Sequence, residues 1–400
     1  MTTEARFAQF HFLTSYPASL INRDDVGFAK RVPFGGAVRT RISSQCLKRH
    51  WRTYDGENSL WEIKDAAAAV RSRRTFDEFV YRPLVGQGVS APLAHAASEG
   101  LMKLMLGRSD KAEAASQKKR KDSAEEQIGP RSEQVTVLGR PELDYLLAQA
   151  RELCATVTDP AKIAAAIDKH FDRNQKENLR ALKLGAGLDA AMFGRMITGD
   201  ILARCDAAVH VAHAFTAHSE ETESDYFSAV DDLLKSGENE ELGSGHIGTV
   251  ELTSGLFYGY VVIDLPLLMR NLSGDGALAA QVLERMVHII ATVSPAAKLG
   301  STAAYAHAGM FLVEKGSSQP RTLANAFLRP ASARTDLLAN AYQALAAHVA
   351  DLDRAYGRNQ RRFLAVSHAD RLAPALGDDE RVASISDLAR WTSEGIGSAR

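Results

Sequence analysis

The sequence predicts an α/β fold of the α+β kind, in which an RRM-like, ferredoxin-type sheet is backed by helices and carries a large helical insertion. Three observations indicate this fold. Strand-like apolar runs occur at residues 7–14, 250–263 and 310–314. Helical spacing of apolar residues, at 277–292, separates the last two runs. Residues 58–190 instead read as mostly helical, which places the insertion there.

Length and composition agree with such a composite chain. The 400 residues, 45% of them hydrophobic, exceed the usual size of one domain, so we expect a main domain with a large insertion, or two domains. Cys46, Cys154 and Cys205 show neither paired nor metal-type spacing, which is typical of a reducing cytoplasm. No apolar run approaches the roughly 18 residues of a membrane span and no secretion leader is recognisable, so we expect a cytoplasmic protein without a membrane partner.

The elements follow in order along the chain. Residues 38–42 alternate between apolar and basic as a strand does, and Ser43 or Ser44 can cap a helix at 46–52. The insertion shows helical spacing at residues 66–79, 91–106, 143–153 and 161–171. Its charged part, residues 111–133, is expected to be exposed surface, with an extra contact to nucleic acid as the alternative. Beyond it we expect helices at residues 206–217 and 336–356, on either side of an acidic, turn-rich excursion that begins at residue 218.

Positive charge concentrates between residues 22 and 52 of a chain that carries −1 overall. This segment has two acids, Asp24 and Asp25, and eight basic residues, which are Arg23, Lys30, Arg31, Arg39, Arg41, Lys48, Arg49 and Arg52. The segment therefore carries +6 (eight minus two) and the remainder −7. Such asymmetry indicates a localised polyanion track, because fixed positive charge near phosphates displaces their counterions.

Local structure in this segment adds geometry to the charge. The expected helix places Lys48 and Arg52 four residues apart, beside an apolar stripe of Leu47 and Trp51. A helix N-terminus that offers serine hydroxyls, Gln45 and cations suits a phosphate. The alternative is a solvated basic helix face.

Aromatic and apolar residues stand out in the acidic excursion. Tyr226, Phe227 and Val230 lie among acidic residues, namely Glu220, Glu221, Glu223, Asp225, Asp231 and Asp232. Such side chains can form an apolar wedge that unstacks bases, or they can pack beneath the loop. Tyr258-Gly259-Tyr260-Val261 also matches four of the eight positions of the RRM aromatic signature, which is weak because aromatic residues are common in strands.

Several short motifs occur together in one order and carry a family resemblance. They are Leu13-Thr14-Ser15-Tyr16-Pro17, Asn22-Arg23-Asp24-Asp25, Phe34-Gly35-Gly36, Arg41-Ile42-Ser43-Ser44-Gln45, Leu47-Lys48-Arg49, Gly194-Arg195-Met196, Ala212-His213-Ala214, Ala229-Val230-Asp231-Asp232, His246-Ile247-Gly248-Thr249 and Ser254-Gly255-Leu256-Phe257-Tyr258. This chain resembles the CasC (Cse4) family, the repeated backbone subunit of the type I-E CRISPR effector Cascade. The resemblance spans nearly the whole chain and becomes loose after about Arg321.

The resemblance implies an organisation and a function. A palm would comprise residues 1–57, 191–217 and 252–400, with helical fingers at 58–190 and a thumb hairpin at 218–251. The protein would polymerise head to tail along a CRISPR RNA and present the guide for pairing with a target DNA strand. Its further partners would be the large, small, capping and RNA-processing subunits of Cascade.

The resemblance also suggests roles for single residues. Arg23, Lys30, Lys48, Arg49 and Arg52 would hold the RNA backbone, while Ser43 and Gln45 bond phosphates. Met196 and Ile247 fall on family positions that contact bases. Tyr226, Phe227, Val230 and Ile247 would displace bases, and Tyr226 stands where the family commonly has Trp.

Signals of enzymes are weak in this chain. Gly243, Gly245 and Gly248 satisfy the spacing of a dinucleotide fingerprint but precede a strand instead of a helix. The histidines 210, 213 and 218 with Cys205 match no zinc spacing, and adjacent aspartates on a strand point apart. We therefore expect no catalysis, no metal and no cofactor. The alternatives are a metal-dependent nuclease and a stand-alone RRM-like RNA-binding protein.

Overall fold

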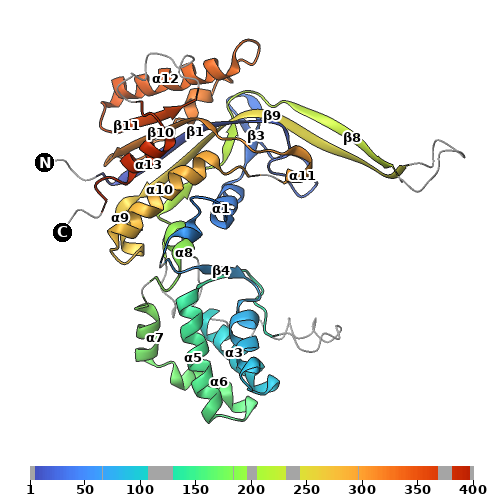
Figure 1. The fold of residues 1–400 in the computed structure, drawn as a ribbon, viewed down its shortest axis with the longest axis vertical. Coiled ribbons are helices and arrows are strands. Elements are labelled where there is room, and N and C mark those ends of the chain that lie inside the picture. Colours follow the sequence, from blue (N-terminus) through green and yellow to red (C-terminus); the bar gives the residue numbers. More distant parts are fainter. Residues whose placement is uncertain are drawn as a thin grey trace, which may run out of the picture. The chain divides into compact units, whose positions relative to one another are not determined.

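The computed structural model describes residues 5–64, 66–106, 129–182, 184–195, 205–230, 244–295, 297–367 and 381–396 (Figure 1). The chain forms two compact units. One comprises residues 1–62, 210–265 and 280–400 and contains the main sheet; the other comprises residues 63–209 and 266–279 and is mostly helical. The predicted mixed α/β class is confirmed.

The main sheet is built around strand β1 (Phe7–Ser19), which pairs antiparallel with β10 (Ala308–Gly316) and β9 (Ser244–Asp264). Phe10 thus lies opposite Val313 on one side and Val261 on the other. The strand order is β11-β10-β1-β9-β7-β3-β2, where the additional strands are β2 (Arg31–Phe34), β3 (Ala37–Ile42), β7 (Ala214–Thr216) and β11 (Arg361–Val366). β1 is buried on both faces from Phe7 to Thr14, a stretch that includes the polar residues Gln9, His11 and Thr14.

Helices cover the sheet on both faces. Leu13 and Tyr258 share a core with Tyr342 and Leu345 of α12 (Leu337–Tyr356). Phe12, the neighbour of Leu13, points to the opposite face, where its ring meets Trp51 of α1 (Ser44–Thr53). Helix α10 (Gly276–Thr292) lies between β9 and β10 in the chain.

A long β-hairpin extends from this sheet (Figure 1). The second half of β9 pairs with β1, and its first half pairs with β8 (Thr222–Val230), from Thr222 opposite Thr253 to Val230 opposite Ser244. One continuous strand therefore belongs to the sheet and to the hairpin, which fixes where the hairpin begins. The short strand β6 (Val209–Val211) also pairs with β9.

The helical unit has a core of its own. Leu101 of α3 (Ala91–Leu106), Leu146 of α5 (Arg140–Thr156) and Ile163 of α6 (Pro160–His170) are fully buried in it. A two-stranded sheet of β4 (Ala69–Ser72) and β5 (Thr136–Gly139) belongs to the same unit. The remaining helices of the described residues are η1 (Leu60–Glu62), η2 (Asp77–Tyr81), α2 (Arg82–Gly86), α7 (Arg173–Arg180), α8 (Leu188–Phe193), α9 (Leu265–Asn271), α11 (Leu299–Thr302), η4 (Ala324–Phe327) and α13 (Ile385–Ser393).

Three sequence-based expectations are wrong. Residues 206–217 do not form a helix but contain β6 and β7, because they pair with strands distant in the sequence. Residues 66–79 contain β4, whose partner β5 lies more than 60 residues further on. In β3 the predicted basic face is absent, since Arg39 is fully buried and Val38 is exposed.

Other predicted features lie partly beyond the described residues. The charged insert, residues 111–133, is described only from residue 129 on. Within the described parts of the chain, no helix is both long and apolar enough to cross a membrane.

Candidate nucleic-acid interface

The candidate interface starts at the N-terminus of α1. Ser43 caps the helix with its hydroxyl, which accepts a hydrogen bond from the Cys46 N–H (3.3 Å). Ser43 is itself held by Asn22, whose side-chain oxygen accepts from the Ser43 N–H (2.9 Å). The first turn of α1 contains no acidic residue. The partial positive charge of the helix N-terminus is therefore not offset by an acidic side chain in this turn, whereas in many helices it is.

Two backbone hydrogen bonds bring cations to this helix end. The Lys30 N–H donates to the Asn22 carbonyl (2.9 Å), and the Arg41 N–H donates to the Lys30 carbonyl (2.7 Å). The Arg41 side chain is steadied further, because its Nε donates to the carbonyl of Arg31 (3.1 Å). The segment before β2 and the end of β3 thus lie together beside α1.

His213 lies between β6 and β7, and the positive charges near the start of α1 affect it. Its Nδ1 accepts from the Ser44 N–H (3.1 Å) and lies 3.4 Å from Nη1 of Arg41. Partial burial lowers the pKa of His213, and the positive charges of Arg41, Lys30 and Lys48 lower it further. Burial raises the pKa of Cys46 to about 11, although the positive charges of Lys30 and Arg49 lower it.

Four basic side chains therefore lie near enough to His213 or to Cys46 to lower the pKa of one of these groups, which places them near the first turn of α1. We call Lys30, Arg41, Lys48 and Arg49 the α1 cation cluster. Backbone N–H groups, hydroxyls and several cations in one place are what a phosphodiester requires. The structure can thus hold a phosphate backbone here, and it brings together the predicted residues Lys30, Ser43, Lys48 and Arg49.

The other predicted contact residues extend this surface. Gln45 is exposed in the first turn, and its Oε1 accepts from the Ser44 hydroxyl (3.3 Å). Arg52 lies in the last turn, eight residues after Ser44, which corresponds to roughly 12 Å along the helix axis. Arg23 is exposed in the preceding turn, where the Asp24 carboxylate accepts from three backbone N–H groups. The predicted track follows one helix from end to end.

Two basic residues of the segment 22–52 make contacts within the protein instead. Arg39 is 0% exposed and donates to the carbonyls of Thr216 (2.9 Å) and Phe327 (2.7 Å), and burial lowers its pKa. Arg31 forms ion pairs with Glu220 and Glu251 at the base of the hairpin. The charge of +6 in the sequence therefore overstates what the surface offers to an anion.

The hairpin separates the two rings that the sequence placed in one wedge. Tyr226 and Phe227 are neighbours in β8, so their side chains point to opposite faces. Tyr226 is 66% exposed and Phe227 is 39% exposed. The other wedge candidates are described by their backbones only: Ile247 pairs with Ser228, and Val230 pairs with Ser244. Met196 lies outside the described residues.

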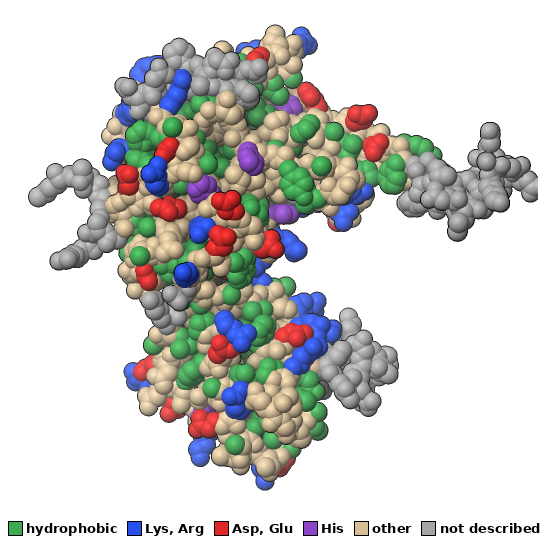
Figure 2. All heavy atoms as spheres, in the orientation of Figure 1, with side chains coloured by type: hydrophobic (Ala, Val, Ile, Leu, Met, Phe, Trp, Pro, Cys, Tyr) green, Lys and Arg blue, Asp and Glu red, His purple; other side chains and the backbone are tan. Residues whose placement is uncertain are grey.

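Phe227 is supported by its surroundings. It lies opposite Gly248, and a Cβ at Gly248 would come within 2.5 Å of the ring. Because Gly248 has no side chain, it leaves the space that the Phe227 ring occupies. Nζ of Lys298 lies 5.9 Å from the ring centroid, so a cation accompanies this ring. Figure 2 shows acidic side chains along the hairpin. The exposed acidic residues of β8 include Glu223 and Asp225.

The remaining motifs belong to the core or to a polar cavity. Tyr258 is buried, and its hydroxyl bonds to Nδ1 of His11 (2.9 Å), so the RRM-like signature does not present this ring to bases. His218 is buried and accepts from the Leu256 N–H (3.1 Å). In the part of the chain that the structure describes, no three His, Cys, Asp or Glu side chains are grouped to hold a metal.

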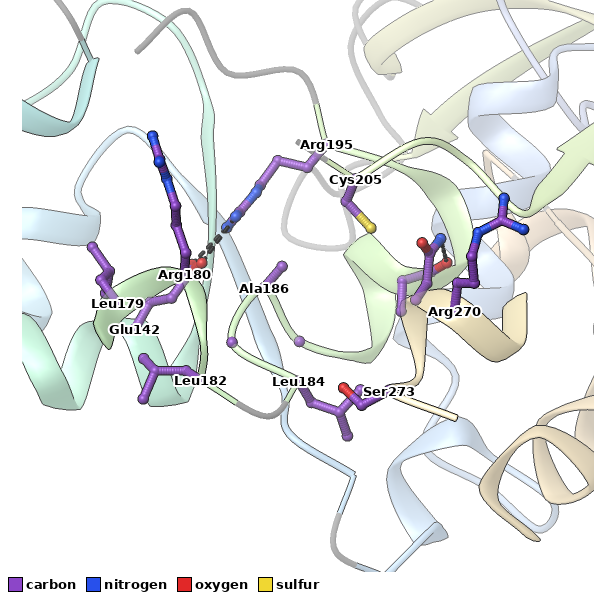
Figure 3. A pocket seen from close by; sticks show the side chains of 14 residues that line it. Glu142, Leu179, Arg180, Leu182, Leu184, Ala186, Arg195, Cys205, Arg270 and Ser273 are labelled. Atoms are coloured by element: carbon purple, nitrogen blue, oxygen red, sulfur yellow. Dashed lines mark hydrogen bonds and ion pairs between the residues drawn. The ribbon is translucent and has the colours of Figure 1, made fainter. Parts of the chain in front are cut away.

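A cavity of about 210 Å³ lies in the helical unit (Figure 3). Its wall includes Arg195, whose guanidinium is fully buried and bonds both carboxylate oxygens of Glu142. Arg195, from the Gly194-Arg195-Met196 motif, therefore anchors the chain within this unit.

Sequence reasoning missed His213 and Arg41 as members of the interface. Both stand in motifs that carry the resemblance, Ala212-His213-Ala214 and Arg41-Ile42-Ser43-Ser44-Gln45, so a signal was present. The sequence nevertheless placed His213 on a helix and Arg41 on one face with Arg39.

Comparisons with known proteins identify the family and the fold. Residues 8–391 match the family model of CT1975-like proteins. A solved chain from a "CRISPR RNA-guided surveillance complex, pre-nicking" is similar over 97% of this chain and 99% of its own length, with 27% identity and a TM-score of 0.78. A second, from a "CRISPR RNA-guided surveillance complex", has the same coverage, 23% identity and a TM-score of 0.68, and shares the fold. Among curated proteins none matches the sequence.

The family match covers nearly all of the chain and confirms the resemblance to the Cascade backbone subunit that the motifs indicated. This chain belongs to the family of CT1975-like proteins.

Proposed function

We propose that this chain is a non-catalytic subunit that binds CRISPR RNA and forms the backbone of a type I-E Cascade surveillance complex in the cytoplasm. The observation that carries the proposal is the α1 cation cluster, which lies near the N-terminus of a helix whose first turn has no acidic residue. The similarity to a chain of an RNA-guided surveillance complex supports RNA as the polyanion.

The chemistry of the interface suits a ligand of any sequence. Serine hydroxyls, backbone N–H groups and cations bind phosphates, which position a nucleic acid but do not identify its bases. Sequence recognition then belongs to the guide RNA, which pairs with the target DNA strand. The protein supplies charge and shape, and the hairpin orders the bases for pairing.

A backbone subunit also has to bind its own copies. When one surface binds a different surface of the next copy, the contact is heterologous and produces a helical filament. We infer such head-to-tail assembly along the RNA, ended by other Cascade subunits: the large, small, capping and RNA-processing subunits.

The salt dependence of RNA binding tests the cluster. Replacing Lys48 and Arg49 together by Gln should lower the slope of log K against log salt by about 1.4, because each phosphate contact to a single strand contributes roughly 0.7. Arg354, an exposed arginine on α12, provides a matched control as Arg354→Gln. Binding of an oligouridylate would be measured by fluorescence anisotropy. An unchanged slope in the double variant, with the monomer folded, would remove the cluster from the interface.

A further inference from the structure

His213 occupies an unusual position at the α1 cation cluster. The Ala212 N–H donates to the Tyr260 carbonyl (3.0 Å), and in the adjoining strand Arg41 lies opposite Phe215. These backbone contacts hold the His213 ring at the first turn of α1, although the residue itself is exposed. The sheet therefore positions the ring, which contacts the N-terminal end of α1 without belonging to that helix.

The hydrogen bonds define the protonation state of this ring. Nδ1 accepts from the Ser44 N–H at 3.1 Å, and the nearest guanidinium nitrogen of Arg41, also a donor, lies 3.4 Å away. A ring nitrogen accepts only when it carries no proton. His213 is thus neutral, with its hydrogen on Nε2.

The same donors are those that a phosphate would use. A backbone N–H in the first turn of a helix and an arginine guanidinium are standard phosphate ligands. One N–H makes one good hydrogen bond, so the ring and a phosphate oxygen compete for the Ser44 N–H.

We propose that His213 holds the phosphate position at α1 before RNA binds, and that RNA displaces it with uptake of one proton at Nδ1. This inference rests on the proposed function. The proton comes from the solvent, and it converts the ring from a competing acceptor into a further cation beside the phosphate. No bond other than this N–H is formed or broken.

The surrounding charges give the sign of the effect. The groups that act on the ring are Arg41 of β3, Lys30 of the segment before β2 and Lys48 of α1, all positive. Together with partial burial they lower the pKa of His213 below its usual value of 6.5. A phosphate in contact with the ring raises the pKa again, because an opposite charge favours the imidazolium. Protons then bind more readily to the complex than to the protein alone, so RNA affinity increases as pH falls.

The experiment measures Kd of a fluorescent oligouridylate for the full chain between pH 5.5 and 8 at constant salt. Uracil takes up no proton in this range. We expect the affinity of the native protein to fall with rising pH, by up to about tenfold per unit, which is the limit for one linked proton. His213→Asn places an amide oxygen near the position of Nδ1 and cannot titrate, so its affinity should depend less on pH. His213→Gln serves as a second variant with the same expectation.

A control and a second measurement complete the test. His348 of α12 also has a pKa lowered by burial, and His348→Asn should retain the native pH dependence. Titration calorimetry in two buffers of different ionisation enthalpy should show proton uptake for the native chain and much less for His213→Asn. Equal pH dependence and equal uptake in these two proteins would overturn the inference and leave RNA binding intact. Absence of RNA binding at every pH would overturn the proposed function and this inference with it.

Discussion

The buried ion pair between Arg195 and Glu142 provides the sharpest test of the helical unit. Nη1 of Arg195 lies 2.5 Å from Oε2 of Glu142, and Nη2 lies 2.9 Å from Oε1. The same Oε2 accepts from the Gly139 N–H (3.1 Å) at the start of α5. One carboxylate thus joins the end of β5, the beginning of α5 and the Arg195 segment.

The size of the effect follows from burial. The Arg195 side chain is 0% exposed and that of Glu142 is 3% exposed, so Arg195→Met leaves a carboxylate without its ion pair in the core. Breaking such a pair costs about 3–5 kcal/mol. Adding Glu142→Gln removes the stranded charge but keeps an oxygen for the Gly139 N–H. The double variant should therefore recover most of the loss.

The measurement is Tm by scanning calorimetry, and the helical unit that holds the pair has about 160 residues. At about 2–4 °C per kcal/mol for this size, Arg195→Met should lower Tm by about 6–20 °C. A loss below about 1 kcal/mol would contradict the buried pair. A double variant as unstable as Arg195→Met would also contradict the prediction, because the loss of stability then does not come from the stranded charge.

Two further predictions concern the sheet unit. Nζ of Lys315 donates to the carbonyls of Trp391, Thr392 and Glu394 (2.9–3.2 Å), so Lys315→Met should speed amide hydrogen exchange in α13. Burial lowers the pKa of Lys315 to about 8, below the 10.5 of an ordinary lysine. Between about pH 8 and pH 10.5 the unfolded chain therefore binds more protons than the folded chain, so the free energy of unfolding measured with urea should rise with pH in this range. Lys315→Met should lack this contribution. Arg31→Gln leaves Glu220 and Glu251 without their ion pair near the cation cluster, and it should weaken RNA binding a few-fold, at about 0.2–1 kcal/mol per charge pair. Adding Glu251→Gln should restore part of the lost RNA affinity, and unchanged RNA binding in Arg31→Gln would contradict this prediction.

Elements specified by local signals were predictable from the sequence. Ser43 was expected to cap α1 and does so, with Leu47 and Trp51 on the buried side. Helix α12 begins after the Asp336 cap, whose carboxylate accepts from the Ala339 N–H, and it ends at Gly357 with a φ of 80°. A cap and an apolar stripe are written within one segment, so no distant residue decides them.

Elements that depend on distant partners were not predictable in this way. β7 has three residues and exists because Ala214 and Phe215 pair with β3, far earlier in the chain. Arg39 is buried because the carbonyls of Thr216 and Phe327 accept its hydrogen bonds, and the local pattern contains neither. His213 joins the interface for the same reason, since its contacts are with Ser44 and Arg41.

The hairpin leads to a last prediction, which distinguishes its two rings. Tyr226 and Phe227 point to opposite faces, so an RNA strand that runs along one face meets one ring. Only Phe227 has a cation beside it, Lys298, among the contacts described for these two rings. A ring beside a cation can stack on a base while the cation meets the adjoining phosphate. We therefore expect Phe227 to be the ring that displaces a guide base.

Stacking of one base on an aromatic ring contributes about 1–3 kcal/mol. Phe227→Ala should therefore leave RNA binding mostly intact, since phosphates dominate affinity, but weaken pairing of the bound guide with target DNA about 5–150-fold. Tyr226→Ala is the matched variant on the opposite face and should have the smaller effect. Target affinity of the assembled complexes, together with chemical reactivity of the guide bases, measures both. A larger loss in Tyr226→Ala would place the guide on the other face of the hairpin, because a strand in contact with that face cannot stack on Phe227.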